Sequence, residues 1–182
     1  RVARATVTGE ADISIWRGGA PTMPRLVRAV GAACQVQPRL NARFDDRAMT
    51  LTSQSAVNLG IAMETTDGLF VPVLNRVTEL TPEALATELE RLEAKVAKRS
   101  IRPAELRGQT ITLSNFGAVA GLHGEMIVVP PQVAIVGAGR AFERPGSGRI
   151  LPLSISFDHR VVTGVEACKF LMALTTDLEL PF

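Results

Sequence analysis

The fold is decided by residues 151–164, LPLSISFDHRVVTG. The first half is an apolar run, typical of a buried strand. The second half leads into a helix at Gly164, with Thr163 and Glu166 in capping-box spacing at its start. His159 lies between the two elements, at a strand-to-loop junction where catalytic groups are commonly held. Because an imidazole there can take up a proton near neutral pH, His159 is the first candidate catalytic residue.

Strands and helices alternate along the rest of the chain. Strands are predicted at 5–15, 50–52, 57–64, 69–74, 109–113, 133–138 and 151–157. One helix is predicted over 22–35 with Thr22 as its N-cap, and a second after the cap Thr81, while the last covers 164–178. Pro72 indicates an edge or a bulge inside its strand. This order predicts an α/β fold, with a mixed sheet and helices in a two-layer sandwich.

Composition excludes several classes of protein. Apolar residues make up 46% of the 182 residues and charged residues 21%, which is typical of one globular domain rather than a disordered chain. The net charge of +2 indicates no nucleic-acid partner, and no apolar run reaches the roughly 20 residues of a membrane-spanning helix. Cys34 and Cys168 are interpreted as buried free thiols, as expected in a reducing compartment.

Five segments resemble, in order, the catalytic domain of dihydrolipoamide acyltransferases, the core components of 2-oxo acid dehydrogenase complexes. Ser156–Gly164 is similar to the family signature Asp-His-Arg-x-x-Asp-Gly. The other four segments are Thr112–Gly117, Val129–Gly137, Gly68–Val73 and Pro38–Ala42. The resemblance implies the sandwich of the CoA-dependent acyltransferases, the chloramphenicol acetyltransferase type. It also implies one catalytic domain over 1–182, interpreted as a fragment without the family's lipoyl and subunit-binding domains.

The resemblance implies transfer of an acyl group between the thiols of dihydrolipoamide and coenzyme A. A thiol must lose its proton to become a good nucleophile, which makes His159 the expected base. Ser114 stands where the family has a serine or threonine that donates to the tetrahedral oxyanion. The alternative is an ordinary strand hydroxyl bonded to nearby backbone. Because succinyl-transferring relatives often carry threonine here, Ser114 favours an acetyl or branched-chain acyl group.

Thr163 is the third candidate site residue and departs from the resemblance. The family has an aspartate four residues after the histidine, where an ion pair helps to hold the site. Threonine and aspartate can both cap a helix, so the loop geometry is expected to survive while the charge is lost. Asp158 is interpreted as structural and not as a replacement, because adjacent side chains point in different directions.

The resemblance also implies an assembly. The family's site lies between trimer subunits, with histidine and hydroxyl from different chains, and the trimers commonly form a hollow 24-mer. The implied partners are coenzyme A, a lipoyl domain, and the decarboxylase and dihydrolipoamide dehydrogenase components. No coenzyme A-binding residue can be named, and no metal, nucleic acid or membrane is expected. The expected compartment is the bacterial cytoplasm, or the mitochondrial matrix in a eukaryote.

Two other functions remain open. Thr163 is compatible with a scaffold core whose catalysis is weakened. A small-molecule O-acetyltransferase of the chloramphenicol type is disfavoured by Asp158 and Arg160, because those relatives usually have His-His-x-x-x-Asp-Gly.

The stretches 16–20 and 140–150 are shorter than in the family. A dinucleotide-binding loop at 136–140 is rejected, because Phe142 replaces its third glycine.

Overall fold

The computed structural model describes residues 2–16, 21–66 and 68–181. The strands are β1 (Arg4–Asp12), β2 (Ala42–Asp45), β3 (Thr50–Ser53), β4 (Leu59–Thr65), β5 (Gly68–Phe70), β6 (Val73–Leu74), β7 (Ile111–Ser114), β8 (Ala134–Ala138), β9 (Phe142–Arg144) and β10 (Gly148–Asp158). The helices are α1 (Thr22–Val36), α2 (Pro82–Ala97) and α3 (Gly164–Leu178), with short 3-10 turns η1 (Pro38–Leu40), η2 (Val77–Glu79), η3 (Pro103–Leu106) and η4 (Phe116–Ala118). Most of the short link at 16–20, and Asp67 in the turn before β5, lie outside the described residues.

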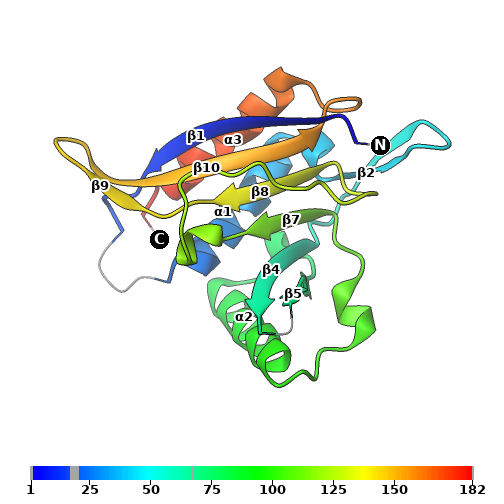
Figure 1. Cartoon of the computed structure of the whole chain (residues 1–182), viewed down its shortest axis with the longest axis horizontal. Coiled ribbons are helices and arrows are strands. Elements are labelled where there is room, and N and C mark those ends of the chain that lie inside the picture. The colour runs from blue at the N-terminus through cyan, green and yellow to red at the C-terminus, as the bar shows by residue number, and fades with distance from the viewer. Residues whose placement is uncertain (1, 17–20, 67, 182) are drawn as a thin grey trace.

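One mixed sheet organises the molecule. Its strand order is β1-β10-β8-β7-β4-β5, with β6 added to β4 and β9 added to β10. Strand β7 is parallel to both β4 and β8, whereas β10 is antiparallel to β1 and to β8. Helices α1 and α3 lie behind the sheet, and α2 lies beside β4 at the other end (Figure 1). The predicted mixed α/β sandwich is therefore confirmed.

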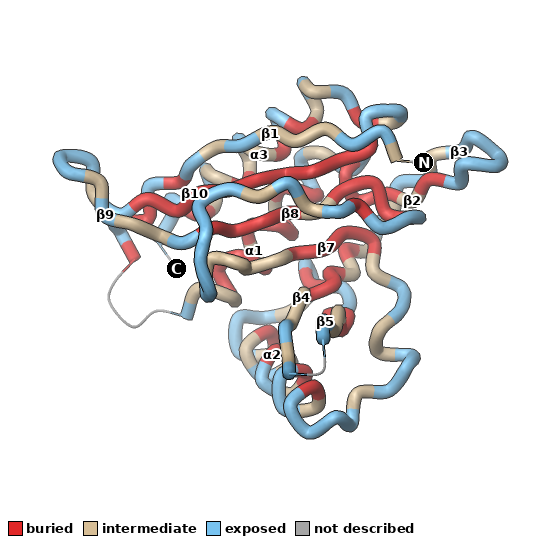
Figure 2. Tube along the Cα trace, viewed as in Figure 1, coloured by how far each residue is buried: buried red, intermediate tan, exposed pale blue. Residues whose placement is uncertain are grey.

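Strand β10 is buried on both faces, and Figure 2 shows it as a continuous buried stripe. Leu153 and Phe157 belong to the core beneath α1 and α3. On the opposite face, the segment between η4 and β8 crosses the sheet. There Ser154 accepts a hydrogen bond from the Gly124 amide at 3.1 Å, and Ser156 accepts one from the Met126 amide at 3.0 Å. Because this segment covers the serine-bearing face of β10 and its amides bind the two hydroxyls, both faces of the strand are buried.

The predicted helices are confirmed with small corrections. Helix α3 has the predicted bounds, and Thr81 caps α2 by accepting from the Ala84 amide at 3.2 Å. The prediction of Thr22 as the N-cap of α1 is wrong. Thr22 is already the first residue of the helix, so Pro21 is the N-cap residue. Cys34 is buried as predicted, whereas Cys168 is exposed, since it lies on the solvent side of α3.

The strands required more correction than the helices. Pro72 ends one ladder, so the predicted strand at 69–74 is split into β5 and β6. Strands β2 and β9 were not predicted. The brief stretch at 140–150 keeps a hairpin, in which Phe142 pairs with Ile150. Among the described residues, no helix is long and apolar enough to span a membrane.

Candidate functional site

His159 lies directly after the last residue of β10 and is exposed. Its backbone amide donates to the Ala3 carbonyl at 2.7 Å, which continues the β1–β10 pairing by one step. Its ring centroid lies 5.5 Å from that of Phe157. Within the described chain, no residue makes a hydrogen bond to the imidazole. The backbone therefore fixes the position of the His159 Cα, and both ring nitrogens are available for chemistry.

Asp158 and Arg160 form a structural pair on either side of His159. Asp158 is only 2% exposed, and Arg160 Nη2 approaches its Oδ2 to 2.5 Å. Burial alone would raise the pKa of Asp158, but hydrogen bonds from Arg160 outweigh it, so the pKa lies below its usual value. The amides of Val161 and Val162 donate to the Asp158 carbonyl at 3.1 and 3.0 Å. These contacts agree with a structural role for Asp158.

Thr163 caps α3 in the predicted capping box. Its hydroxyl accepts from the Glu166 amide at 3.3 Å, and its amide donates to Glu166 Oε2 at 2.7 Å. The Thr163 hydroxyl also donates to the same oxygen at 2.9 Å. Glu166 Oε1 then meets Arg39 Nε at 3.0 Å. The end of the loop that follows His159 is thus bound by a carboxylate. This carboxylate belongs to Glu166 of α3, whereas in the family the carboxylate stands at the position of Thr163.

Arg39 was not identified from the sequence, although it lies in the segment Pro38–Ala42. It comes from η1, which packs against α3. Besides Glu166, it binds the loop itself, because Nη2 donates to the Val161 carbonyl at 2.8 Å. The only sequence signal was its place in the segment Pro38–Ala42, which resembles the family, since nothing local predicts a partner more than 120 residues away.

Ser114 is the last residue of β7 and is half-buried. It pairs in register with Ala62 of β4 and with Gly137 of β8. Because Leu113 is fully buried in the core, strand alternation turns Ser114 toward the face opposite the helices. Among the described residues, none makes a hydrogen bond to its hydroxyl. The described residues thus give no support to the alternative of a hydroxyl bonded to nearby backbone, and within them the group is free to donate.

One chain does not bring Ser114 and His159 together. Ser114 is in register with Gly137, and Gly137 is in register with Ser154. His159 comes five residues after Ser154, so it is about 17 Å farther along the strand direction at about 3.3 Å per residue. It is also two strands away in the sheet order. The arrows of β7 and β10 point in opposite directions (Figure 1).

The hollows near the motif are lined by other residues. One of about 50 Å³ is lined by Asp158 and Arg160 together with Phe44 and Pro130, but not by His159. Two larger ones, of about 610 and 300 Å³, share Arg43, Pro130 and Pro131. His159 and Ser114 line none of these three hollows. The hollows therefore do not identify any coenzyme A-binding residue.

The comparison of sequences identifies a family and a relative. A family model described as 2-oxoacid dehydrogenases acyltransferase (catalytic domain) matches residues 17–182. The chain is 40% identical over 172 residues to the lipoamide acyltransferase component of the branched-chain alpha-keto acid dehydrogenase complex of Pseudomonas aeruginosa. This match covers 91% of the chain and 40% of that relative, so the chain spans about two fifths of the relative's length.

The comparison of structures identifies the fold. The dihydrolipoamide acetyltransferase of Azotobacter vinelandii matches with a TM-score of 0.92 at 28% identity, over 98% of this chain and 82% of that one. The cubic core of the pyruvate dehydrogenase multienzyme complex matches with a TM-score of 0.90 at 28% identity, with the same coverage. Chloramphenicol acetyltransferase shares the fold, with a TM-score of 0.69 at 14% identity over 96% of this chain and 88% of that one. The predicted fold class is confirmed.

Proposed function

Because the chain belongs to the family of 2-oxoacid dehydrogenase acyltransferase catalytic domains, we propose that it transfers an acyl group between dihydrolipoamide and coenzyme A. The observation that carries the proposal is the pair of free groups, a base at His159 and a donor at Ser114, in two motifs of this family. The other site contacts are backbone or ion-pair contacts, which are suited to holding these two groups and not to chemistry.

In the proposed reaction, His159 accepts the proton of the attacking thiol. The thiolate forms a bond to the carbonyl carbon of the acyl thioester, and the Ser114 hydroxyl donates to the resulting oxyanion. When the intermediate collapses, the bond to the leaving sulfur breaks, and that sulfur takes the proton from His159. The proton returns to a thiol, so the base is regenerated without any net change.

The separation of the two residues supports a site shared between chains. A base and an oxyanion donor must lie within a few ångströms of the same carbonyl, which one chain does not allow here. We therefore infer that His159 of one subunit works with Ser114 of its neighbour in a homotrimer. A cubic core among the similar structures supports assembly of trimers into a 24-mer.

Thr163 keeps its place in this proposal, as a positioning residue. The Azotobacter vinelandii enzyme was studied for the roles of a serine, a histidine and an asparagine in its catalytic mechanism, the last two four positions apart. His159 and Thr163 have the same spacing. A polar, uncharged residue at this position is thus no argument for the alternative of a weakened scaffold.

The acyl group is proposed to be acetyl or branched-chain. The relative from Pseudomonas aeruginosa is named for the branched-chain complex. Coenzyme A, a lipoyl domain, and the decarboxylase and dihydrolipoamide dehydrogenase components are the proposed partners, in the bacterial cytoplasm or the mitochondrial matrix.

The test is acyl transfer from acetyl-CoA and isobutyryl-CoA to free dihydrolipoamide by the purified assembly. His159→Ala should lower kcat by about two to four orders of magnitude, the usual contribution of a general base. His123→Ala is the control, because His123 is the other histidine of the chain and is exposed in a loop outside the His159 motif. A folded assembly without transfer, or a His159→Ala variant with normal kcat, would contradict the proposal.

A further inference from the structure

The loop from His159 to Thr163 is held at both of its ends. At the start, the His159 amide binds the Ala3 carbonyl, and the Asp158 carbonyl accepts from two loop amides. At the other end, Thr163 binds Glu166 Oε2 through its amide and its hydroxyl. Arg39 bridges the middle and the end, because its guanidinium contacts both the Val161 carbonyl and Glu166 Oε1.

We propose that Arg39 and Glu166 are positioning residues for His159, acting as a clamp on the loop that carries it. The clamp is Arg39, Glu166, Thr163 and the Val161 carbonyl. This inference rests on the proposed function only for its catalytic consequence, since the contacts exist whatever the reaction.

The imidazole has little else to orient it. Among the described residues it makes no hydrogen bond or ion pair, and its aromatic contact is with the tilted ring of Phe157. An aromatic contact fixes a ring less narrowly than a hydrogen bond to a ring nitrogen. The orientation of His159 therefore depends on the backbone on both sides of it. A misplacement of about 1 Å at a reacting group can cost about 100-fold in rate, so a small shift of this loop matters.

Each side-chain atom of Arg39 and Glu166 that takes part in the clamp has its own partner. The two oxygens of Glu166 have different partners, one facing Arg39 and one facing Thr163. Arg39 uses two different nitrogens, Nε for the carboxylate and Nη2 for the carbonyl. A planar guanidinium can make both contacts at once, whereas the single ammonium of a lysine cannot reproduce this fork.

The charges around Glu166 agree with this arrangement. Burial would raise its pKa, but hydrogen bonds from the Thr163 amide and hydroxyl outweigh burial, helped by Arg39 and Lys169, and the pKa lies below its usual value. The Glu166 side chain is 23% exposed and that of Arg39 is 50% exposed. The ion pair is therefore expected to add little to global stability, because exposed pairs are typically worth below about 1 kcal/mol.

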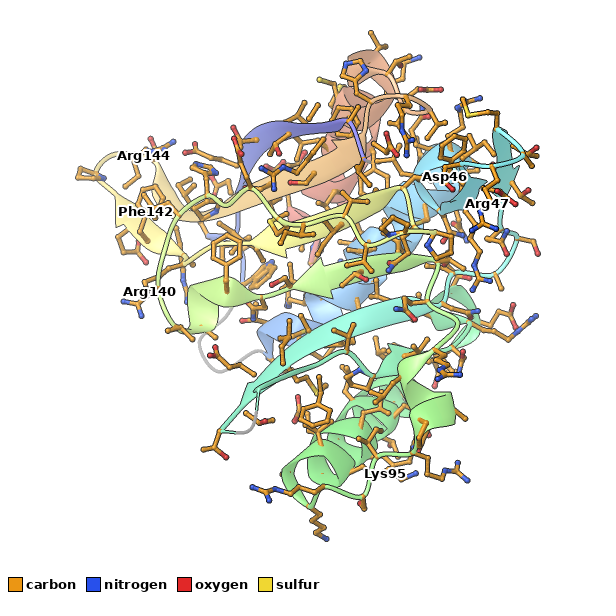
Figure 3. All side chains as sticks on the ribbon, turned by 45° about the vertical axis from the view of Figure 1, so that its right-hand side comes forward. Asp46, Arg47, Lys95, Arg140, Phe142 and Arg144 are labelled. Atoms are coloured by element: carbon orange, nitrogen blue, oxygen red, sulfur yellow. The ribbon has the colours of Figure 1, made fainter. Side chains whose placement is uncertain are left out.

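This difference between stability and position gives the test. Arg39→Met removes both contacts of the arginine, and Glu166→Gln keeps a capping-box residue while removing the charge. The matched control is Arg144→Met with Glu10→Gln, an ion pair of 2.7 Å between β9 and β1 with exposures of 40% and 37%. Figure 3 shows Arg144 together with Phe142 on the hairpin. Arg144 pairs with Gly148 at the start of β10, whereas His159 follows the end of that strand.

Two measurements are made on the purified assembly. The first is kcat and KM for both thiol substrates. Arg39→Met and Glu166→Gln should each lower kcat by about 10- to 100-fold with nearly unchanged KM, and the double variant should lose less than the product of the two. Arg39→Lys should recover part of the loss. The second is hydrogen exchange of the amides at 160–163, which should quicken in Arg39→Met and Glu166→Gln but not in the control pair.

Each contrary result overturns the inference. Unchanged exchange at 160–163 would mean that the clamp does not hold the loop. Faster exchange with unchanged kcat would mean that the clamp does not position His159. Equal losses of kcat in the control pair would make the effect general. An assembly that is inactive in its natural sequence contradicts the proposed function instead, while loop exchange still decides whether the clamp exists.

Discussion

Ser114 is the last residue of β7 and His159 directly follows β10, and these two strands of the same sheet run in opposite directions. The two side chains therefore lie toward opposite ends of the strands. Strand β8 lies between them, parallel to β7 and antiparallel to β10. The proposed base and the proposed donor therefore lie far from one another within one chain, and no described residue makes a hydrogen bond to either side chain. The proposed site needs both residues, so it would be complete only with a second copy of the chain.

Replacing Ser114, the proposed oxyanion donor, tests its role separately from that of His159, the proposed base. Ser114→Ala should lower kcat by about 100- to 1000-fold with KM for coenzyme A nearly unchanged, the usual loss for one donor. Ser147→Ala, in the exposed turn between β9 and β10, should have no effect. A Ser114→Ala variant that lost only affinity for coenzyme A would place this residue in binding and not in catalysis.

The cap of α3 should have a measurable free energy. Thr163→Ala removes the hydroxyl that accepts from the Glu166 amide and should lower the free energy of unfolding by about 1 kcal/mol. Thr163→Ser keeps that acceptor and should stay close to the natural chain. Denaturant unfolding of both variants makes the comparison. Equal stability of Thr163→Ala and Thr163→Ser would show that the hydroxyl contributes nothing.

Acid should weaken the pair beneath His159. The folded pKa of Asp158 is below its unfolded value, so its stabilisation is fully present above about pH 4 and is lost as pH falls through the folded pKa. Asp158→Asn should cost about 2 kcal/mol at pH 7, the loss of hydrogen bonds to a charged group. Its deficit should shrink below pH 4 in urea unfolding. A deficit that is the same at pH 7 and pH 3 would contradict this assignment.

A close approach of two backbones supports the end of β7. A Cβ added to Gly117 would lie 2.0 Å from the carbonyl carbon of Gly139, a backbone atom that cannot turn aside. Gly117→Ala should therefore destabilise by about 3 kcal/mol and disturb Ser114, three residues earlier. Gly164→Ala is the control, because nothing lies within 4 Å of its added Cβ. Thermal unfolding in which the two variants behave alike would refute the close packing.

Local patterns predicted the helices well. Leu85, Leu89, Leu92 and Val96 recur at three- and four-residue steps, which is typical of one helix face, and all four are buried in α2. Thr163 and Glu166 gave the start of α3, because a capping box is a contact between near neighbours. The motifs also predicted His159 and Ser114 as site residues, and in the structure both have free polar groups at strand ends.

Contacts between distant residues could not be predicted in this way. The separation of Ser114 from His159 depends on strand order, which no local pattern contains. The meeting of Arg39 with Glu166 depends on η1 packing against α3. The exposure of Cys168 depends on which side of α3 packs against the sheet: Ala167 and Phe170 are buried on that side, and Cys168 lies on the other.

The central claim is that each site takes His159 from one chain and Ser114 from another, and mixed assemblies test it most directly. His159→Ala and Ser114→Ala chains are coexpressed in equal amounts, and the composition of the purified assembly is checked by intact mass. Random mixing in a closed homotrimer leaves about a quarter of the sites with both natural residues. We predict that the mixed assembly recovers about a quarter of the natural kcat, although each variant alone is at least about 100-fold slower. Activity no higher than the average of the two single variants would contradict the shared site.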